Sequence, residues 1–317
     1  MDALVEAAST TAEPVIVVDN VRHVYKGGTL ALDGVELEIG TGLFGLLGPN
    51  GAGKSTLMRI ICTLLVPSAG RVTVAGHDVV RERRAVRTLF GYLPQEFGAW
   101  RLQRVEEVLD TLGILSGLRN RVERHRRVDE VLESVGLSDV SDRKVKTLSG
   151  GMVRRLGVAQ ALLHEPNILV VDEPTVGLDP EERLRFRQLM ARLGRDRVIV
   201  LSTHIVADLG SGCEDLALID RGKVCFRGSP ADLIGRADGM VHEVTVEGVR
   251  EAELSSDLEI VSRSVDGTHV KLRVVCAADQ APSGAVQGTD VTLEEAYLAF
   301  MAKRGRAADA VVDEEAS

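Results

Sequence analysis

The segment Gly48-Pro-Asn-Gly-Ala-Gly-Lys-Ser-Thr56 has the residue types and spacing of a phosphate-binding loop. The apolar run 43–47 precedes it and apolar residues at helical spacing follow it, so we expect a strand, the loop and then a helix. Glycines let backbone N–H groups converge on phosphate oxygens, and the start of a helix adds partial positive charge. We therefore expect Lys54 to contact the β- and γ-phosphates of a nucleoside triphosphate and the Ser55 hydroxyl to bind Mg²⁺. The loop residues expected to contact the nucleotide are Gly48, Pro49, Asn50, Gly51, Ala52, Gly53, Lys54, Ser55 and Thr56.

Two acidic residues, Asp172 and Glu173, end the apolar run 168–171. A magnesium–nucleotide site needs an acidic residue at the end of a buried strand beside the phosphate loop, which makes Asp172 a predicted Mg²⁺ ligand. Glu173 is placed to polarise an attacking water as a general base. The alternative is a strand that ends in an acidic turn, which is common, but the phosphate loop favours the site.

Apolar runs alternate with helical patterns through the first two thirds of the chain, which predicts an α/β fold. Short, fully apolar strands fit a mostly parallel central sheet covered on both faces. Strands are expected at 15–18, 35–39, 43–47, 71–75, 168–171, 198–201 and 216–219. Helices are expected at 57–64, 103–137, 152–163 and 184–193.

Composition narrows the classes of protein that this chain can represent. It has 317 residues, of which 44% are apolar and 27% charged, as in a soluble globular protein. The net charge of −9 argues against a general nucleic-acid binder, so no nucleic-acid partner is expected. Four widely spaced cysteines predict buried thiols rather than a metal site. The longest apolar run, 57–66, is shorter than the ~20 residues that a membrane span needs.

A second motif, Leu148-Ser-Gly-Gly-Met152, lies between the phosphate loop and the acidic pair. With them it resembles the nucleotide-binding domain of ATP-binding cassette (ABC) transporters, over roughly residues 15–234. In that family this signature segment completes the ATP site of a second cassette, and two glycines and a serine at a helix start make an anion cradle. The resemblance implies a dimer in which Ser149, Gly150 and Gly151 contact the ATP of the partner copy. Many family members have Gln where this chain has Met152, so the polar contacts of that Gln are absent.

Four more positions resemble functional residues of the family. Tyr25 resembles the aromatic residue that stacks on adenine, and Gln95 resembles the glutamine that touches Mg²⁺ and water. Asp179 resembles the residue that links the two ATP sites, and His204 the histidine that contacts the γ-phosphate. The resemblance therefore implies catalytic roles for Lys54, Gln95, Glu173 and His204, and Mg²⁺ binding by Ser55, Gln95 and Asp172.

The resemblance also implies a division of the chain. We expect a flexible leader at 1–13 and an ABC ATP-binding domain at 14–236, with a mostly parallel sheet, an antiparallel β part and a helical subdomain at about 96–165. A composition change predicts a small β-rich α+β domain at 240–303, followed by a disordered tail at 304–317. The segment 292–300 within that small domain resembles the tail of cassettes in drug- and antibiotic-export (ABC-2 type) systems.

The function implied is that of an ATPase subunit that uses ATP and Mg²⁺ to drive export through a separate integral membrane permease. It would act as a homodimer, peripheral on the cytoplasmic face of the cell membrane. Three alternatives stay open: an importer ATPase, a non-transport ABC ATPase of translation or DNA repair, and a binding module without hydrolysis. The single phosphate loop argues against the non-transport class, which usually carries two cassettes, and Glu173 argues against the binding module.

Overall fold

The computed structural model describes residues 15–98, 100–247, 259–277 and 280–305. The chain forms two compact units, Met1–Arg227 and Gly228–Ser317. The expected leader, 1–13, lies outside the described residues, as does most of the expected tail. Among the described residues, none of the helices is long and apolar enough to cross a membrane.

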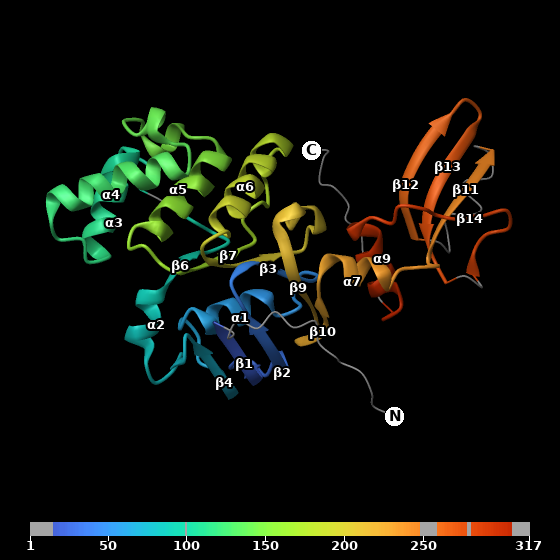
Figure 1. Cartoon of the computed structure of the whole chain (residues 1–317), viewed down its shortest axis with the longest axis horizontal. Helices are drawn as coiled ribbons and strands as arrows, with labels where there is room; N and C mark the ends of the chain where they lie inside the picture. The colour runs from blue at the N-terminus through green and yellow to red at the C-terminus, as the bar shows by residue number, and fades with distance from the viewer. Residues whose placement is uncertain (1–14, 99, 248–258, 278–279, 306–317) are drawn as a thin grey trace. The chain divides into compact units, whose positions relative to one another are not determined.

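A six-stranded sheet with the order β10-β9-β3-β8-β7-β6 forms the centre of the first unit (Figure 1). Strand β3 pairs in parallel with β8 and β9, and β7 pairs in parallel with β6 and β8. Every residue of β7 and β8 is buried, as is typical of parallel strands covered on both faces. The strands are β3 (Gly42–Leu47), β6 (Phe90–Leu93), β7 (Ile168–Asp172), β8 (Val198–Thr203), β9 (Cys213–Asp220) and β10 (Lys223–Gly228).

An antiparallel sheet with the order β2-β1-β4-β5 forms a second layer of this unit. Its buried residues share one hydrophobic core with helix α1 (Lys54–Ile61), which follows β3. The antiparallel β part implied by the family resemblance is therefore present. Its strands are β1 (Ile16–Val24), β2 (Leu30–Ile39), β4 (Ala69–Val74) and β5 (His77–Asp78).

Helices α3 (Val105–Leu115), α4 (Arg121–Ser134) and α5 (Gly150–Leu162) lie together in the first unit, within the expected subdomain 96–165 (Figure 1). We expected one helical stretch at 103–137, and the structure has two helices there. Gly117 has a φ of +97°, a left-handed conformation that ends the first helix. Asn120 then caps the second, because its side-chain oxygen accepts hydrogen bonds from two backbone N–H groups of the first turn. The remaining helices of this unit are α2 (Arg83–Leu89) and α6 (Pro180–Leu193), with four short 3₁₀ helices: η1 (Ser138–Val140), η2 (Val145–Thr147), η3 (Val206–Asp208) and η4 (Gly210–Gly212).

Among its described residues, the second unit has a four-stranded antiparallel sheet with the order β12-β13-β11-β14, together with two helices. Helix α7 (Pro230–Gly235) packs against α9 (Leu293–Ala302), so it belongs to this unit. The boundary between the two units therefore lies between Arg227 and Gly228, whereas we expected the first domain to end at residue 236. The strands are β11 (Val241–Glu247), β12 (Glu259–Asp266), β13 (His269–Val275) and β14 (Val286–Gln287).

Candidate functional site

The phosphate loop connects β3 to α1, and close packing requires glycine at two of its positions, Gly48 and Gly53. A Cβ on Gly48 would lie 2.2 Å from the backbone oxygen of Ile219 on β9. Gly53 has a φ of +110° and directly precedes α1, where a Cβ would lie 2.6 Å from the Ala31 oxygen. No side chain caps α1, so the N–H groups of its first turn are available to an anion.

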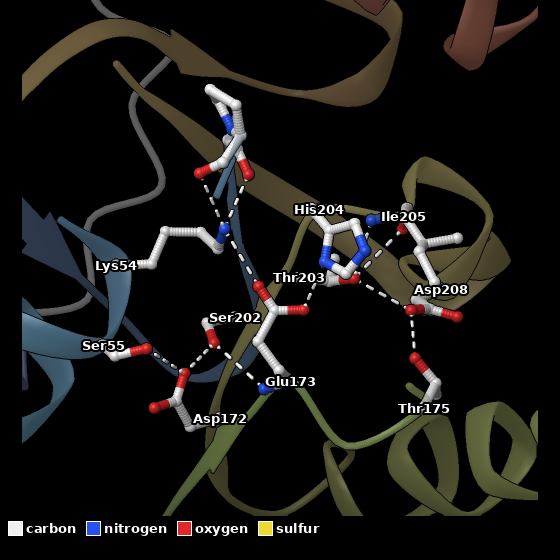
Figure 2. A network of polar contacts seen from close by, with 12 residues as sticks. Lys54, Ser55, Asp172, Glu173, Thr175, Ser202, Thr203, His204, Ile205 and Asp208 are labelled. Carbon is white, nitrogen blue, oxygen red and sulfur yellow. Dashed lines mark hydrogen bonds and ion pairs between the residues drawn. The ribbon is translucent and has the colours of Figure 1, made fainter. Parts of the chain in front are cut away.

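Lys54 lies inside this loop with its side chain only 5% exposed. Its Nζ donates to the backbone oxygens of Gly48 at 2.6 Å and Pro49 at 3.1 Å. It also forms an ion pair with Glu173, whose Oε1 is 2.9 Å away (Figure 2). A full positive charge is thereby fixed beside the first turn of α1.

Asp172 lies at the end of β7, next to Ser55 in the first turn of α1. The hydroxyls of Ser55 (3.2 Å) and Ser202 both donate to its Oδ1 (Figure 2). Carboxylate and hydroxyl oxygens are ligands that suit Mg²⁺, which usually takes one or two carboxylates with phosphate and water completing its shell. Among the described residues there is no cluster of three or more metal-binding side chains. The oxygens of Asp172 and Ser55 are donors of the kind that Mg²⁺ takes together with phosphate and water.

Glu173 has a backbone φ of +47°, a left-handed conformation that costs ~1–3 kcal/mol outside glycine. Its N–H points at Ser202, whose backbone oxygen and hydroxyl are each 3.1 Å away. The carboxylate lies between Lys54 and His204, whose Nδ1 is 2.7 Å from Oε2. Burial by itself would raise the pKa of Glu173, but the hydrogen bond from His204 and the charge of Lys54 together lower the pKa below its ordinary value.

The register of the sheet explains why Glu173 and His204 meet. Asp172 pairs with Ser202 across β7 and β8, two adjacent parallel strands. The residues that follow these strands therefore leave the same edge of the sheet side by side. Gln95 leaves this edge as well, because Leu93 of β6 pairs with Val171 of β7. The Gln95 side chain is exposed, and its backbone oxygen accepts a hydrogen bond from Arg154 of α5.

Tyr25 lies beside the phosphate-loop helix. Its hydroxyl is 3.0 Å from the Thr56 hydroxyl, and its ring makes an edge-on contact with the ring of His23 at 4.8 Å between centroids. Tyr25 as a whole is 37% exposed. An exposed aromatic face next to a phosphate site is open to stacking with a flat ring.

The signature residues and Asp179 begin helices α5 and α6. Ser149 caps α5 by accepting a hydrogen bond from the Met152 N–H, and Asp179 caps α6 by accepting one from the Glu182 N–H. Gly150 and Gly151 form the first turn of α5. The contacts of Lys54 and Ser55 described above are with the phosphate loop and the acidic pair, and none of these contacts is with the signature residues or Asp179. The fold thus brings together Lys54, Ser55, Asp172, Glu173 and His204, with the signature and Asp179 elsewhere in the same unit.

Sequence reasoning missed four residues of this network: Thr175, Ser202, Thr203 and Asp208. Ser202 joins Asp172 to the backbone of Glu173, and its position at the polar end of an apolar strand was a signal for it. Thr175 and Thr203 both donate to Asp208. Nothing in the local sequence pattern marks Asp208, which reaches its partners only in the folded chain.

Comparison with known proteins identifies the family. The model of the ABC transporter family matches residues 32–176. The linearmycin resistance ATP-binding protein LnrL of Bacillus subtilis (strain 168) is 35% identical over 239 residues, covering 74% of this chain and 76% of the relative. The chain belongs to the ABC transporter ATP-binding family. It is an ATPase with the cassette fold, and ATP is its nucleotide.

Further relatives support the same assignment. The daunorubicin resistance ATP-binding protein DrrA3 of Streptomyces coeruleorubidus is 39% identical over 230 residues, 72% of each chain. The Nod factor export ATP-binding protein I of Rhizobium sp. (strain N33) is 39% identical over 210 residues, 66% of this chain and 69% of the relative.

Solved structures agree with this cassette fold. CbiO1 from Clostridium perfringens, part of the ABC transporter complex CbiONQ, has a TM-score of 0.65 at 26% identity, covering 71% of this chain and 92% of that one. The dimeric cassette MJ0796 has a TM-score of 0.61 at 28% identity, covering 68% and 98%.

Proposed function

We propose that this ATPase drives export of a substrate through a separate integral membrane permease. The relatives named for linearmycin resistance, daunorubicin resistance and Nod factor export support export over import. We place the cassette on the cytoplasmic face of the cell membrane, where a permease subunit would receive the motion of the nucleotide-bound pair. The observation that carries the hydrolytic role is the carboxylate of Glu173, held between Lys54 and His204 and next to Asp172.

Each residue of the network has a proposed role in hydrolysis. Lys54 and the N–H groups at the start of α1 bind the β- and γ-phosphates and offset their negative charge. Glu173 accepts a proton from the attacking water as the water oxygen bonds to the γ-phosphorus and the bond to the β-phosphate oxygen breaks. His204 orients the Glu173 carboxylate and contacts the γ-phosphate. Tyr25 stacks on the adenine ring.

Ser55, Asp172 and Gln95 are the residues that would hold Mg²⁺. A bound Mg²⁺ would supply positive charge that offsets the negative charge of the phosphates. Asp172 is suited to this because it is 1% exposed and already fixed by the two serine hydroxyls. The exposed side chain of Gln95 has the freedom to reach the same group from β6.

We also propose that two copies of this chain form the working unit. The signature residues Ser149, Gly150 and Gly151 would contact the ATP bound by the other copy, and Asp179 would link the two sites. Closing of this pair on ATP, followed by reopening after hydrolysis, would be the motion passed to the permease. A dimeric structure of the related cassette MJ0796 supports this arrangement.

Replacement of the proposed base tests the hydrolytic role. Glu173→Gln keeps the shape of the side chain but removes its ability to accept a proton, so steady-state ATP hydrolysis should fall at least about a hundredfold. The variant should still bind ATP and accumulate as an ATP-dependent dimer, measured by size-exclusion chromatography with light scattering. Glu181→Gln is the matched control, because Glu181 is an exposed carboxylate at the start of α6. Turnover at the wild-type rate in Glu173→Gln would refute the base assignment.

A further inference from the structure

Asp208 is a buried carboxylate that joins the two segments carrying Glu173 and His204. It ends the short 3₁₀ helix η3 and is 1% exposed. Its Oδ2 accepts hydrogen bonds from the hydroxyls of Thr175 and, at 2.8 Å, Thr203 (Figure 2). One carboxylate oxygen therefore connects the segment after β7 to the end of β8.

The two threonines lie close in sequence to Glu173 and His204, so their hydrogen bonds to Asp208 affect how these two residues are placed. Thr175 lies two residues after Glu173, and Thr203 directly precedes His204. Thr203 Oγ1 also accepts a hydrogen bond from the Ile205 N–H at 2.9 Å, so the chain is held on both sides of His204. Movement of either segment would change the 2.7 Å distance between His204 Nδ1 and Glu173 Oε2.

The backbone of Glu173 needs such support. Its left-handed conformation persists only where the surrounding structure holds it. On its N-terminal side, Ser202 accepts the Glu173 N–H. On its C-terminal side, the hydrogen bond from Thr175 to Asp208 fixes the chain two residues further on. Without the second anchor, the segment after β7 could relax and carry the carboxylate away from His204.

The surroundings of Asp208 indicate a role in geometry rather than in packing. Burying a carboxylate is costly unless its oxygens are satisfied, and its Oδ1 is buried without a hydrogen bond in the described part of the chain. Burial raises the pKa of Asp208, although the two threonine hydroxyls and the nearby charges of Arg183 and Arg187 on α6 act in the opposite direction. An apolar residue of similar size would fill this space at lower cost but would release both threonines.

We propose that Asp208 is a positioning residue for ATP hydrolysis, which holds Glu173 and His204 in register through Thr175 and Thr203 without contacting the nucleotide. The proposal rests on the roles proposed above for Glu173 and His204. It predicts an effect on the rate of the chemical step and little effect on ATP binding, because Lys54 and the phosphate loop keep their own contacts with the backbone oxygens of Gly48 and Pro49.

A pair of substitutions at Thr175 tests this with little change in volume. Thr175→Val removes the hydroxyl and Thr175→Ser keeps it. Misplacement of a reacting group by an ångström can cost up to about a hundredfold in rate, so we expect Thr175→Val to lower kcat for ATP about tenfold, with KM changed less than about twofold. Thr175→Ser should recover most of kcat. Asp208→Ala should lower kcat at least as much, and adding Thr175→Val to it should cause no further loss.

Thr63→Val is the matched control for general loss of stability. Thr63 is also buried, and its hydroxyl accepts a hydrogen bond from Arg87 in another part of the same unit. This variant should unfold at a lower temperature than wild type while keeping kcat. The proposal is overturned if folded Thr175→Val keeps the wild-type kcat, if Thr175→Ser is as slow as Thr175→Val, or if Thr63→Val is equally slow. Should Asp208→Ala fail to fold, the Thr175 pair still decides.

Glu173→Gln separates failure of this inference from failure of the proposed base. If Glu173→Gln turns over ATP normally, the base assignment fails and the positioning role fails with it. If Glu173→Gln is inactive while Thr175→Val is fully active, the base stands and only the role of Asp208 is refuted.

Discussion

The pKa of Glu173 is subject to physical effects that act in opposite directions. Removing a carboxylate from water favours its protonated form, while a nearby ammonium and a hydrogen-bond donor favour its ionised form. Here the hydrogen bond from His204 and the charge of Lys54 outweigh burial, so the pKa of Glu173 is lowered. A carboxylate that stays ionised down to acidic pH can accept a proton at physiological pH, as the proposed role of Glu173 requires.

This direction of the pKa shift predicts how stability depends on pH. A Glu whose folded pKa lies below the unfolded value of about 4.3 stabilises the fold at every pH above that value, and the stabilisation is lost as the pH falls through the folded pKa. Glu173→Gln should therefore destabilise the first unit by about 1–3 kcal/mol, because it leaves the buried Lys54 without its charged partner. The cost should not shrink between about pH 8 and pH 5.5.

Urea unfolding followed by the fluorescence of Trp100 measures this cost, because Trp100 is the only tryptophan of the chain and lies in the first unit. A cost that disappears toward pH 5.5 would mean that burial dominates and that the pKa of Glu173 is raised.

At the scale of elements, helices α5 and α6 meet where the signature begins. A Cβ on Gly151 would lie 2.2 Å from Glu182 Oε2, so the second signature glycine leaves room for this side chain. Glu182 pairs with Arg155 of α5 at 3.4 Å, and its N–H donates to Asp179. The two segments expected to reach a partner copy are therefore packed against each other through Glu182.

Two alanine substitutions should separate packing from phosphate binding in the signature. Gly151→Ala should destabilise the first unit by about 1–3 kcal/mol, because the new methyl group overlaps the buried Glu182 side chain. Gly150→Ala should change stability by less than about 1 kcal/mol, because the nearest atom to its Cβ is Leu178 Cδ2 at 3.8 Å. Urea unfolding compares the two, and equal stability would argue against the packing role of Gly151.

At the scale of the whole molecule, one copy of this cassette is proposed to supply only half of each ATP site. Ser149 and Asp179 make local capping bonds in this chain, while Lys54, Ser55, Asp172, Glu173 and His204 converge. A head-to-tail pair would supply the missing signature to each phosphate loop. The described network lies within the first unit.

Mixing two inactive variants tests the composite site. Lys54→Ala removes the positive charge of the phosphate loop, and Gly150→Asp places a negative charge in the signature cradle, so each homodimer should be inactive. In a mixed dimer both substitutions lie in one ATP site and the other site is intact. About half of the dimers in an equal mixture are mixed, and each has one working site of two, so the mixture should recover about a quarter of wild-type hydrolysis. Phosphate release by the mixture measures this. Full activity of Gly150→Asp alone would contradict a role for the signature in the site.

Much of the site could be predicted from sequence because its main residues belong to short motifs at the ends of elements. Lys54, Ser55, Asp172 and Glu173 follow or begin buried segments, and their residue types specify phosphate and metal chemistry locally. The apolar runs likewise predicted most strands of the first unit. Strand β6 was missed because it is short and contains Gly91, and the break at Gly117 was hidden in a charged helical pattern.

From sequence alone, residue types could suggest the chemistry: the groups proposed to bind phosphate, the carboxylates proposed for the metal and the water, and a mostly parallel sheet. The tertiary structure decided the geometry, because parallel pairing of β7 with β8 brings Glu173 against His204. The left-handed backbone conformation of Glu173, and the hydrogen bonds of Ser202 and Asp208 that hold this segment, also arise only in the folded chain. Asp208 and Thr175 are distant in the chain and carry no motif. Their contact exists only because folding brings the turn after β8 against the segment that follows β7.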